Sequence, residues 1–178
     1  MNIILVGFMA CGKSSVGRYL AEKTGMTVVD LDNVIVEKAG MSIPEIFETV
    51  GEKAFRDLES YCVSLIDTMD NCIVSTGGGA ILREQNRKNL KQNGFVVWLE
   101  TTPENVFKYT QNRVDRPLLA NNQSIDKIQQ MMAEREPLYR DSSHHSIKGY
   151  EHNLYSIYQE ITDVYSVFKY QQSQVNCL

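Results

Sequence analysis

The chain has 178 residues, of which 43% are apolar, a length and composition that suit one domain with its own core. Its 18 Lys and Arg against 22 Asp and Glu give a net charge of −4, so no overall positive field exists to attract nucleic acid or an acidic membrane. Four cysteines without paired spacing argue against a zinc site or a disulfide framework and indicate a reduced, cytoplasmic compartment.

Short apolar, β-branched runs alternate with segments of helical periodicity, which predicts a parallel sheet covered by helices on both faces. The first run is too short for a signal-peptide core, and none is long enough to span a bilayer. We expect a single domain over residues 1–178. The five runs are residues 3–6, 27–29, 72–74, 95–99 and, more weakly, 145–147.

Directly after the first run, residues 7–15 read Gly-Phe-Met-Ala-Cys-Gly-Lys-Ser-Ser, the strand-then-loop context of a phosphate-binding P-loop. Gly7 and Gly12 let backbone N–H groups approach phosphate oxygens without a Cβ in the way. Lys13 can reach the β and γ phosphates, and Ser14 can offer its hydroxyl to Mg²⁺. The alternative is a plain turn between strand and helix. The residues expected to bind ATP here are Gly7, Ala10, Cys11, Gly12, Lys13, Ser14 and Ser15.

Two carboxylates follow the second run, in the sequence Asp30-Leu31-Asp32. Ligands of open α/β sheets bind at the carboxyl ends of the strands, which makes these side chains candidates for a site. One could hold magnesium through water, and the other could accept the proton of an acceptor hydroxyl. Capping of the next helix by one of them is the competing interpretation.

A helical stretch over residues 52–69 places six apolar side chains on one face, which is typical of packing against a core. Arg56 and Glu59 lie off that stripe and three residues apart, so they can neighbour one another on a polar face. Ser42 and Glu45 form a capping box before an earlier helix. The six apolar residues are Phe55, Leu58, Cys62, Leu65, Ile66 and Met69.

Glycines at positions 77–79 follow the third run, and their bare backbone can approach a small ligand closely, although a flexible turn has the same composition. Four arginines carry forked donors suited to carboxylate or phosphate, although most arginines are solvated surface groups. These arginines are Arg56, Arg116, Arg135 and Arg140.

The polar segment 112–123 carries Arg113 and Arg116, and a loop of this size is unusual unless it binds or covers a ligand. Two arginines beside an expected nucleotide favour a lid over an inert connection. Further along, an apolar stripe marks a last helix, after which we expect a polar tail at 166–178 that frays from about residue 170. The stripe consists of Leu154, Ile157, Tyr158, Ile161 and Tyr165.

Taken together and in order, these motifs resemble the shikimate kinase family over residues 1 to about 165. The resemblance implies an α/β, P-loop nucleoside-monophosphate-kinase-like fold of three layers, with a five-stranded parallel sheet of order 2-3-1-4-5. It also implies a substrate-binding subregion at 31–60 and a lid at 112–123. The motifs are Gly-Phe-Met-x-x-Gly-Lys-Ser at 7–14, Asp-x-Asp at 30–32, Phe-Arg-x-x-Glu at 55–59, Gly-Gly-Gly at 77–79, Arg-Pro-Leu-Leu at 116–119 and Arg-x-Pro-Leu-Tyr-Arg at 135–140.

Family resemblance further implies transfer of a phosphoryl group from ATP to a ring hydroxyl of shikimate, giving shikimate 3-phosphate and ADP. Asp32 would be the base, while Lys13 and Arg116 would meet the phosphates. Ser14 would ligate Mg²⁺, with Asp30 supporting it through water. The partners expected are ATP and shikimate, with no nucleic acid and no membrane, in a monomer. The residues expected to bind shikimate are Asp32, Arg56, Gly78, Gly79 and Arg135.

The chain departs from the family pattern at a few positions. Ala10 stands where a glycine is usual, so the loop backbone is displaced if that position needs a positive φ. Tyr109 replaces an arginine that packs on adenine and could stack without a charge. Residues 148–153 match the expected adenine loop poorly. Cys11 is either a small filling residue or an oxidisable thiol near a helix N-terminus.

Other functions remain to be weighed against this one. A kinase of the same fold could act on another acceptor, such as gluconate or a nucleoside monophosphate, although the latter needs a larger base pocket. A GTPase is disfavoured because the chain has no Asn-Lys-x-Asp motif. A nucleotide-binding module without catalysis is disfavoured because Lys13, Ser14, Asp30, Asp32 and Arg116 are all present.

Overall fold

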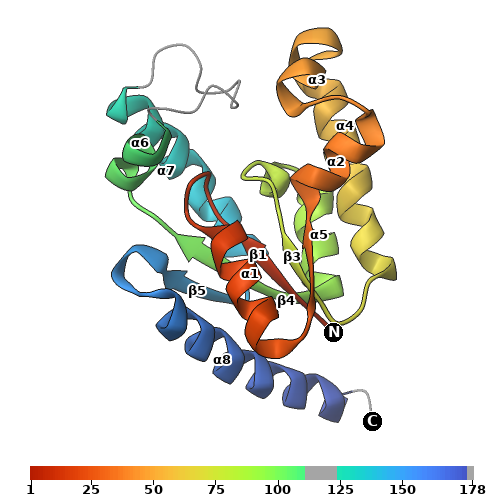
Figure 1. The fold of residues 1–178 in the computed structure, drawn as a ribbon, viewed down its shortest axis with the longest axis vertical. Coiled ribbons are helices and arrows are strands. Elements are labelled where there is room, and N and C mark those ends of the chain that lie inside the picture. Colours follow the sequence, from red (N-terminus) through yellow and green to blue (C-terminus); the bar gives the residue numbers. More distant parts are fainter. Residues whose placement is uncertain (111–123, 176–178) are drawn as a thin grey trace.

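The computed structural model describes residues 1–110 and 124–175, and it leaves 111–123 and 176–178 undescribed. The segment predicted to be a lid, with Arg113 and Arg116, therefore lies outside the described residues. In the described ranges, helices flank a central sheet on both sides (Figure 1). None of these helices combines the length and hydropathy that crossing a membrane requires.

All five predicted runs form strands of one parallel sheet with the order β2-β3-β1-β4-β5, so the fold class expected from the sequence is confirmed. Strand β1 is central, and each of its residues is buried. The strands are one or two residues longer than the apolar runs because they include polar residues or, in β4, also a glycine at their ends. They span Asn2–Val6 (β1), Thr27–Asp30 (β2), Cys72–Ser75 (β3), Gly94–Glu100 (β4) and His145–Lys148 (β5).

The connections between the strands are helical. The long helices are α1 (Lys13–Thr24), α2 (Leu31–Ala39), α4 (Gly51–Ser64), α5 (Glu84–Asn93), α6 (Pro103–Thr110), α7 (Ile125–Ser142) and α8 (Leu154–Val175). The shorter elements are α3 (Ile43–Thr49) and the 3-10 turns η1 (Leu65–Thr68), η2 (Ala80–Leu82) and η4 (Gly149–Glu151).

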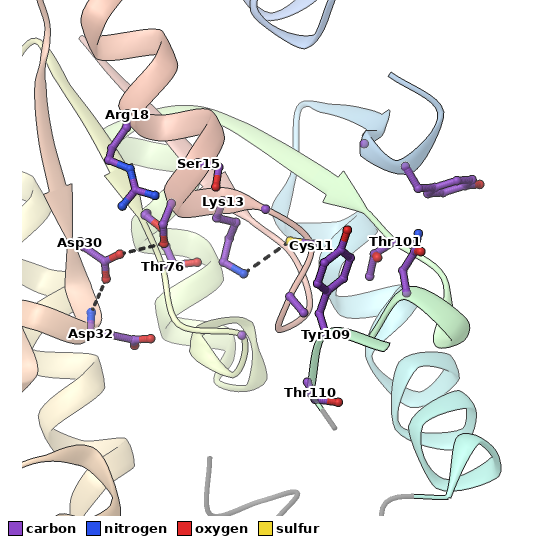
Figure 2. Close-up of a pocket in the computed structure, with 18 of the residues that line it drawn as sticks. Cys11, Lys13, Ser15, Arg18, Asp30, Asp32, Thr76, Thr101, Tyr109 and Thr110 are labelled. Carbon is purple, nitrogen blue, oxygen red and sulfur yellow. Dashed lines mark hydrogen bonds between the residues drawn. The ribbon is translucent and has the colours of Figure 1, made fainter. Parts of the chain in front are cut away.

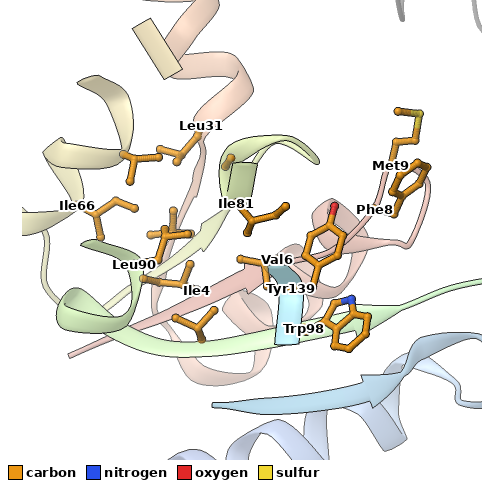
Figure 3. Packing of buried hydrophobic residues seen from close by; sticks show 14 of the residues in the cluster. Ile4, Val6, Phe8, Met9, Leu31, Ile66, Ile81, Leu90, Trp98 and Tyr139 are labelled. Atoms are coloured by element: carbon orange, nitrogen blue, oxygen red, sulfur yellow. The ribbon is translucent and has the colours of Figure 1, made fainter. Parts of the chain in front are cut away.

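Alternation along β1 builds two cores, one on each face of the sheet. Ile4 and Val6 face a cluster that includes residues of α4, α5, α6 and α7 (Figure 3). Ile3 and Leu5 face the opposite cluster, which α1 and α8 complete. The sheet is therefore covered on both faces, and its carboxyl edge stays available for ligands.

Local signals predicted several helix details. Ser42 and Glu45 form the expected capping box at α3, with both reciprocal hydrogen bonds present. All six residues of the apolar stripe in 52–69 are buried or half-buried, although α4 ends at Ser64 and continues as the turn η1. Arg56 and Glu59 do neighbour one another, but they are buried rather than placed on a solvated face.

The last helix is longer than the sequence predicted. We expected fraying from about residue 170, but α8 continues through Val175. Before that point the helix is joined to distant residues: Phe168 packs against the rings of Phe95 and His144, and the Tyr165 hydroxyl donates to the Met1 carbonyl. Polar composition alone gave no sign of these contacts.

Candidate active site

Two adjoining cavities open at the carboxyl edge of the sheet. The larger has a volume of about 830 Å³ and is lined by the P-loop, Asp30, α6 and the turn η4 (Figure 2). The smaller has a volume of about 290 Å³ and lies against α2, α3, α4 and the glycines 77–79. Asp32 and Gly78 line both cavities. A residue at this junction can contact ligands in both spaces, as group transfer requires.

The P-loop folds around its own lysine. Lys13 Nζ donates to the carbonyl oxygens of Gly7 at 2.7 Å and Phe8 at 3.0 Å, and the side chain is buried. Gly12 precedes α1 with a left-handed φ of 94°, and Ser14 and Ser15 in the first turn line the large cavity. The helix therefore presents its N-terminal end and the positive end of its dipole to this space, which suits a phosphate.

The two loop glycines are needed for different reasons. A Cβ on Gly12 would meet nothing within 4 Å, so its positive φ is the requirement. A Cβ on Gly7 would lie 2.7 Å from Cys11 Sγ and also against the Leu99 carbonyl oxygen. Gly7 thus allows close packing of the loop on β4. From the sequence we had expected only that Gly7 lets the backbone approach phosphate. Cys11 is half-buried and fills the space above Gly7.

Ala10 adopts a φ of 63°, in the left-handed region that a Cβ disfavours. From the sequence we expected a displaced loop backbone if position 10 needs a positive φ, and the structure has a positive φ there. The loop nevertheless keeps the form of a phosphate cradle, so the chain accepts local strain at Ala10 rather than a different loop path.

Asp30 makes the two kinds of contact that the sequence left open. Its Oδ1 accepts from the Asp32 backbone N–H at 3.0 Å and caps α2, while its Oδ2 accepts from the Ser14 hydroxyl at 3.1 Å. Capping and a site role are therefore compatible. Serine and carboxylate oxygens lie together beside the P-loop, and such hard oxygen donors are those that Mg²⁺ prefers.

The smaller cavity is charged on one wall. Arg56 Nη1 donates to Glu59 Oε2 at 2.8 Å, and Arg56 Nε and Nη2 donate to Glu52 at 3.3 and 3.1 Å. Burial raises the pKa of Glu59, and the nearby Arg56 opposes that rise. Arg135 of α7 also lines this cavity, and its Nη1 donates to the Gly78 carbonyl at 3.4 Å. Two buried guanidinium groups therefore converge on one small space, which suits a carboxylate.

Each of the three glycines at 77–79 makes room for a different neighbour. A Cβ on Gly77 would lie 2.8 Å from Asp32 Oδ1 and 3.0 Å from Glu59 Oε1. A Cβ on Gly78 would lie 3.2 Å from the Met9 backbone nitrogen, and one on Gly79 would collide with the Arg56 guanidinium. The run is therefore a packing requirement of the site and not a flexible turn.

Tyr139 is a residue of the site that sequence reasoning missed. Its hydroxyl donates to the Gly78 carbonyl at 2.6 Å, and its ring is buried against Trp98. Burial raises its pKa, so the hydroxyl stays protonated and keeps donating. Two signals were available: Tyr139 is part of the motif at 135–140, and its spacing of four from Arg135 puts both on one face of α7.

The smaller cavity also has an apolar wall, which was not predicted. The cavity therefore combines charged and apolar lining residues, as a small ring compound bearing a carboxylate and hydroxyls would require. Its members are Met9, Val36, Ile43, Pro44, Phe47 and Phe55.

One of the candidate arginines that the structure describes, Arg140, does not line either cavity. Arg140 is exposed, pairs with Glu136 and lies over the Trp98 ring, so it is a surface residue. Arg116 lies outside the described residues. The replaced adenine position, Tyr109, and the poorly matching turn η4 both line the larger cavity.

Comparison with known proteins identifies the chain's relatives. The sequence model of shikimate kinases matches residues 9–166. The chain belongs to the shikimate kinase family. The shikimate kinase of Geobacter metallireducens is 48% identical over 141 residues, which cover 79% of each chain. That of Symbiobacterium thermophilum is 38% identical over 165 residues, covering 92% of this chain and 95% of the relative.

A solved structure of this family is also similar in three dimensions. Shikimate kinase from Acinetobacter baumannii, in complex with shikimate, superposes with a TM-score of 0.86 at 38% identity and covers 92% of this chain and 91% of its own. The whole arrangement of sheet, P-loop and flanking helices is thus that of a shikimate kinase.

Proposed function

We infer that this chain transfers the γ-phosphoryl group of ATP to a ring hydroxyl of shikimate, giving shikimate 3-phosphate and ADP. Family membership supports the reaction, and the observation that carries it for this chain is the pair of adjoining cavities joined at Asp32. The larger has a P-loop for the nucleotide, and the smaller has two buried arginines for an anionic acceptor.

Asp32 is the proposed base. It lines both cavities, so its carboxylate can accept the proton of the attacking hydroxyl where the acceptor meets the γ-phosphate. Lys13 supplies a buried positive charge that stabilises the phosphoryl group as charge moves onto the leaving oxygen. Arg116 is proposed to act on the same phosphates from the segment 112–123.

Arg56 and Arg135 are proposed to hold the shikimate carboxylate by charge-assisted, forked hydrogen bonds. Gly78 and Gly79 let the substrate lie close to the backbone beside them. The apolar wall then faces the unsubstituted part of the ring. In this proposal the arginines bind the carboxylate, and a ring hydroxyl is turned toward Asp32.

A magnesium ion fits the polar corner formed by Ser14 and Asp30. When bound, Mg²⁺ neutralises phosphate charge and orients the phosphates for transfer. The Ser14 hydroxyl would be a ligand, and Asp30 would act through water while its other oxygen still caps α2. The cap keeps the Asp30 carboxylate beside the P-loop before any metal binds.

Coupled ATP turnover with and without shikimate tests the assignment. We expect turnover that depends on shikimate, and a kcat that falls by at least ~100-fold in Asp32→Asn, because general-base catalysis contributes that order. Gluconate and a nucleoside monophosphate serve as competing acceptors. Turnover with either of them in place of shikimate would replace the acceptor, and ADP binding without any turnover would indicate a non-catalytic module.

A further inference from the structure

The carbonyl groups of the three glycines beside the smaller cavity are not satisfied in the same way. The Gly77 carbonyl accepts from the Ala80 N–H at 3.2 Å. The Gly79 carbonyl accepts from the Leu82 N–H at 3.0 Å, so both of these bonds are made by the adjoining turn η2. The Gly78 carbonyl receives no backbone N–H from the residues that the structure describes. Its orientation is therefore left to side chains from elsewhere in the fold.

The peptide between Gly78 and Gly79 is one that turns easily. Its orientation depends on ψ of the first glycine and φ of the second, and neither residue has a Cβ that restricts these angles. In a planar trans peptide the carbonyl and the N–H point to opposite sides, so a rotation that moves the Gly78 carbonyl also moves the Gly79 N–H. Gly79 lines the smaller cavity, and its N–H donates to no other residue of 1–110 or 124–175. Whatever holds the Gly78 carbonyl thus sets the direction of a donor beside this cavity.

Two side chains of α7 reach the Gly78 carbonyl. The Tyr139 hydroxyl donates to it at 2.6 Å, whereas Arg135 Nη1 lies at 3.4 Å, close to the limit for a hydrogen bond. The shorter bond makes Tyr139 the main support of this carbonyl. Arg135 is therefore not needed for that support when it binds an anion.

The Tyr139 side chain is itself held firmly. It is 2% exposed, and its ring stacks on Trp98 with the ring centroids 5.7 Å apart and the planes at 12°. Figure 3 shows the hydroxyl oxygen at the end of the Tyr139 ring that points away from Trp98. A buried tyrosine hydroxyl needs a hydrogen-bond partner, and the Gly78 carbonyl provides it. Tyr139 lines neither cavity, so its effect on a ligand passes through Gly78.

We propose that Tyr139 is a positioning residue of the acceptor site: its hydroxyl holds the peptide between Gly78 and Gly79 so that the Gly79 N–H faces the acceptor. The proposal rests on the proposed function in taking the smaller cavity as the acceptor site. The P-loop confines the same peptide from another side, because a Cβ on Gly78 would lie 3.2 Å from the Met9 backbone nitrogen. Tyr139 completes this confinement with a directed bond.

Replacing Tyr139 by Phe tests the proposal, because it removes the hydroxyl and keeps the ring that packs on Trp98. We expect the shikimate KM to rise by about tenfold, the size of the effect of one lost hydrogen bond. The ATP KM should change little, because the residues of the P-loop keep their own contacts. Steady-state kinetics of the full chain, with shikimate and ATP varied in turn, give both values.

Tyr165→Phe is the matched control. The Tyr165 hydroxyl also donates to a backbone carbonyl, that of Met1, at 2.7 Å, and Tyr165 lines neither cavity. Each variant loses one hydrogen bond from a hydroxyl to a carbonyl, so both should lower the free energy of unfolding measured with denaturant. The shikimate KM should rise in Tyr139→Phe and stay unchanged in Tyr165→Phe, which separates positioning from a general loss of stability.

Three results would overturn the proposal. They are an unchanged shikimate KM in Tyr139→Phe, an equal rise of both KM values in that variant, and a rise of the same size in Tyr165→Phe. An equal rise of both KM values would mean that the hydroxyl supports the P-loop as a whole and not the acceptor site.

The same experiment distinguishes this proposal from the proposed function. If the parent protein phosphorylates another acceptor in place of shikimate, the proposed function is wrong, and the KM for that acceptor gives the same comparison of variants. If the parent protein phosphorylates shikimate and Tyr139→Phe has the same shikimate KM, the role of Tyr139 is wrong and the proposed function stands.

Discussion

The guanidinium of Arg56 donates a 2.8 Å hydrogen bond to the carboxylate of Glu59, and both side chains are buried in the wall of the smaller cavity. A buried carboxylate beside a guanidinium fixes the direction in which the guanidinium N–H donors point. This contact fits two interpretations. In the structural one the pair only stabilises the fold, and in the functional one it orients Arg56 to bind the acceptor. Variants can separate them.

Replacing Glu59 by Gln should raise the shikimate KM by about tenfold, because Arg56 loses the partner that orients it. The free energy of unfolding should fall by about 3 kcal/mol, since breaking a buried pair leaves a charge uncompensated. Arg56→Lys keeps the charge but loses the planar fork, and it should raise the same KM with little change in the KM for ATP.

Glu52→Gln is the matched control, because Glu52 contacts the same guanidinium but is exposed, and exposed pairs contribute at most about 1 kcal/mol. Steady-state kinetics and denaturant unfolding of the three variants give the comparison. If Glu59→Gln and Arg56→Lys lower stability but leave the shikimate KM alone, the pair is structural only and the carboxylate clamp is wrong.

A methyl group at position 79 should displace the acceptor clamp. The Cβ of Gly79→Ala would collide with the Arg56 guanidinium, so this group must shift from its position in the cavity wall. We expect the shikimate KM to rise by roughly tenfold or more, an effect of the size of one lost charge-assisted hydrogen bond. Gly17→Ala, whose Cβ meets only ordinary contacts at 3.6 Å, is the control and should leave that KM unchanged.

Local patterns were sufficient to predict the sheet and the P-loop. The β-branched runs, the glycine spacing at 7–12 and the capping box from Ser42 to Glu45 each involve residues that are close in sequence. The strand order, however, came from resemblance to a family and not from periodicity. The strands, the P-loop and the start of α3 were therefore predictable from residues alone.

The misses involve contacts between distant residues. Arg56 and Glu59 lie off the apolar stripe of α4, which normally indicates solvent, but the glycines at 77–79 and the second cavity enclose them. Tyr139 reaches the Gly78 carbonyl across 61 positions of sequence. The packing of Phe168 on Phe95 likewise joins α8 to a residue far away in the sequence. No local rule reports such contacts.

Strain at Ala10 gives a prediction about stability. Its φ of 63° costs roughly 1–2 kcal/mol for a residue with a Cβ, and part of the gain from Ala10→Gly is offset by the greater entropy of glycine in the unfolded chain. We expect Ala10→Gly to raise the free energy of unfolding by about 0.5–1 kcal/mol, or Tm by roughly 1–3 °C.

Asn71→Gly is the natural comparison, because Asn71 has a similar φ of 55° but asparagine tolerates this region. We expect a smaller gain there in the same thermal unfolding experiment. A Tm for Ala10→Gly at or below that of the parent protein would show that the P-loop does not store this strain.

His144 makes the stability of the sheet depend on pH. Its Nδ1 accepts from the Val96 backbone N–H at 3.0 Å, an arrangement that needs a neutral ring, and its own backbone N–H donates to the Val96 carbonyl at 2.8 Å. Burial lowers the pKa of His144, and the nearby positive charge of Lys91 lowers it further. The native state therefore binds this proton less readily than the unfolded chain does.

The sign follows from proton linkage. Between the lowered native pKa and the ordinary value of 6.5, the unfolded state binds more protons, so the free energy of unfolding falls as pH falls through this window. One proton contributes at most about 1.4 kcal/mol per pH unit. Above pH 6.5 the contribution is fully present and constant. In His144→Asn, an amide oxygen can accept from Val96 without titrating, so this part of the pH dependence should disappear.

Denaturant unfolding of both proteins between pH 8 and about pH 5 measures the difference and cancels groups that titrate equally in each. His152→Asn, which changes an exposed histidine with no hydrogen bond to another described residue, should follow the parent protein. His144→Asn removes the titrating ring and keeps the acceptor, so it must change the slope of unfolding free energy against pH wherever proton uptake at His144 contributes. If the curves of His144→Asn and the parent protein stay parallel down to pH 5, proton uptake at His144 is not what weakens the fold.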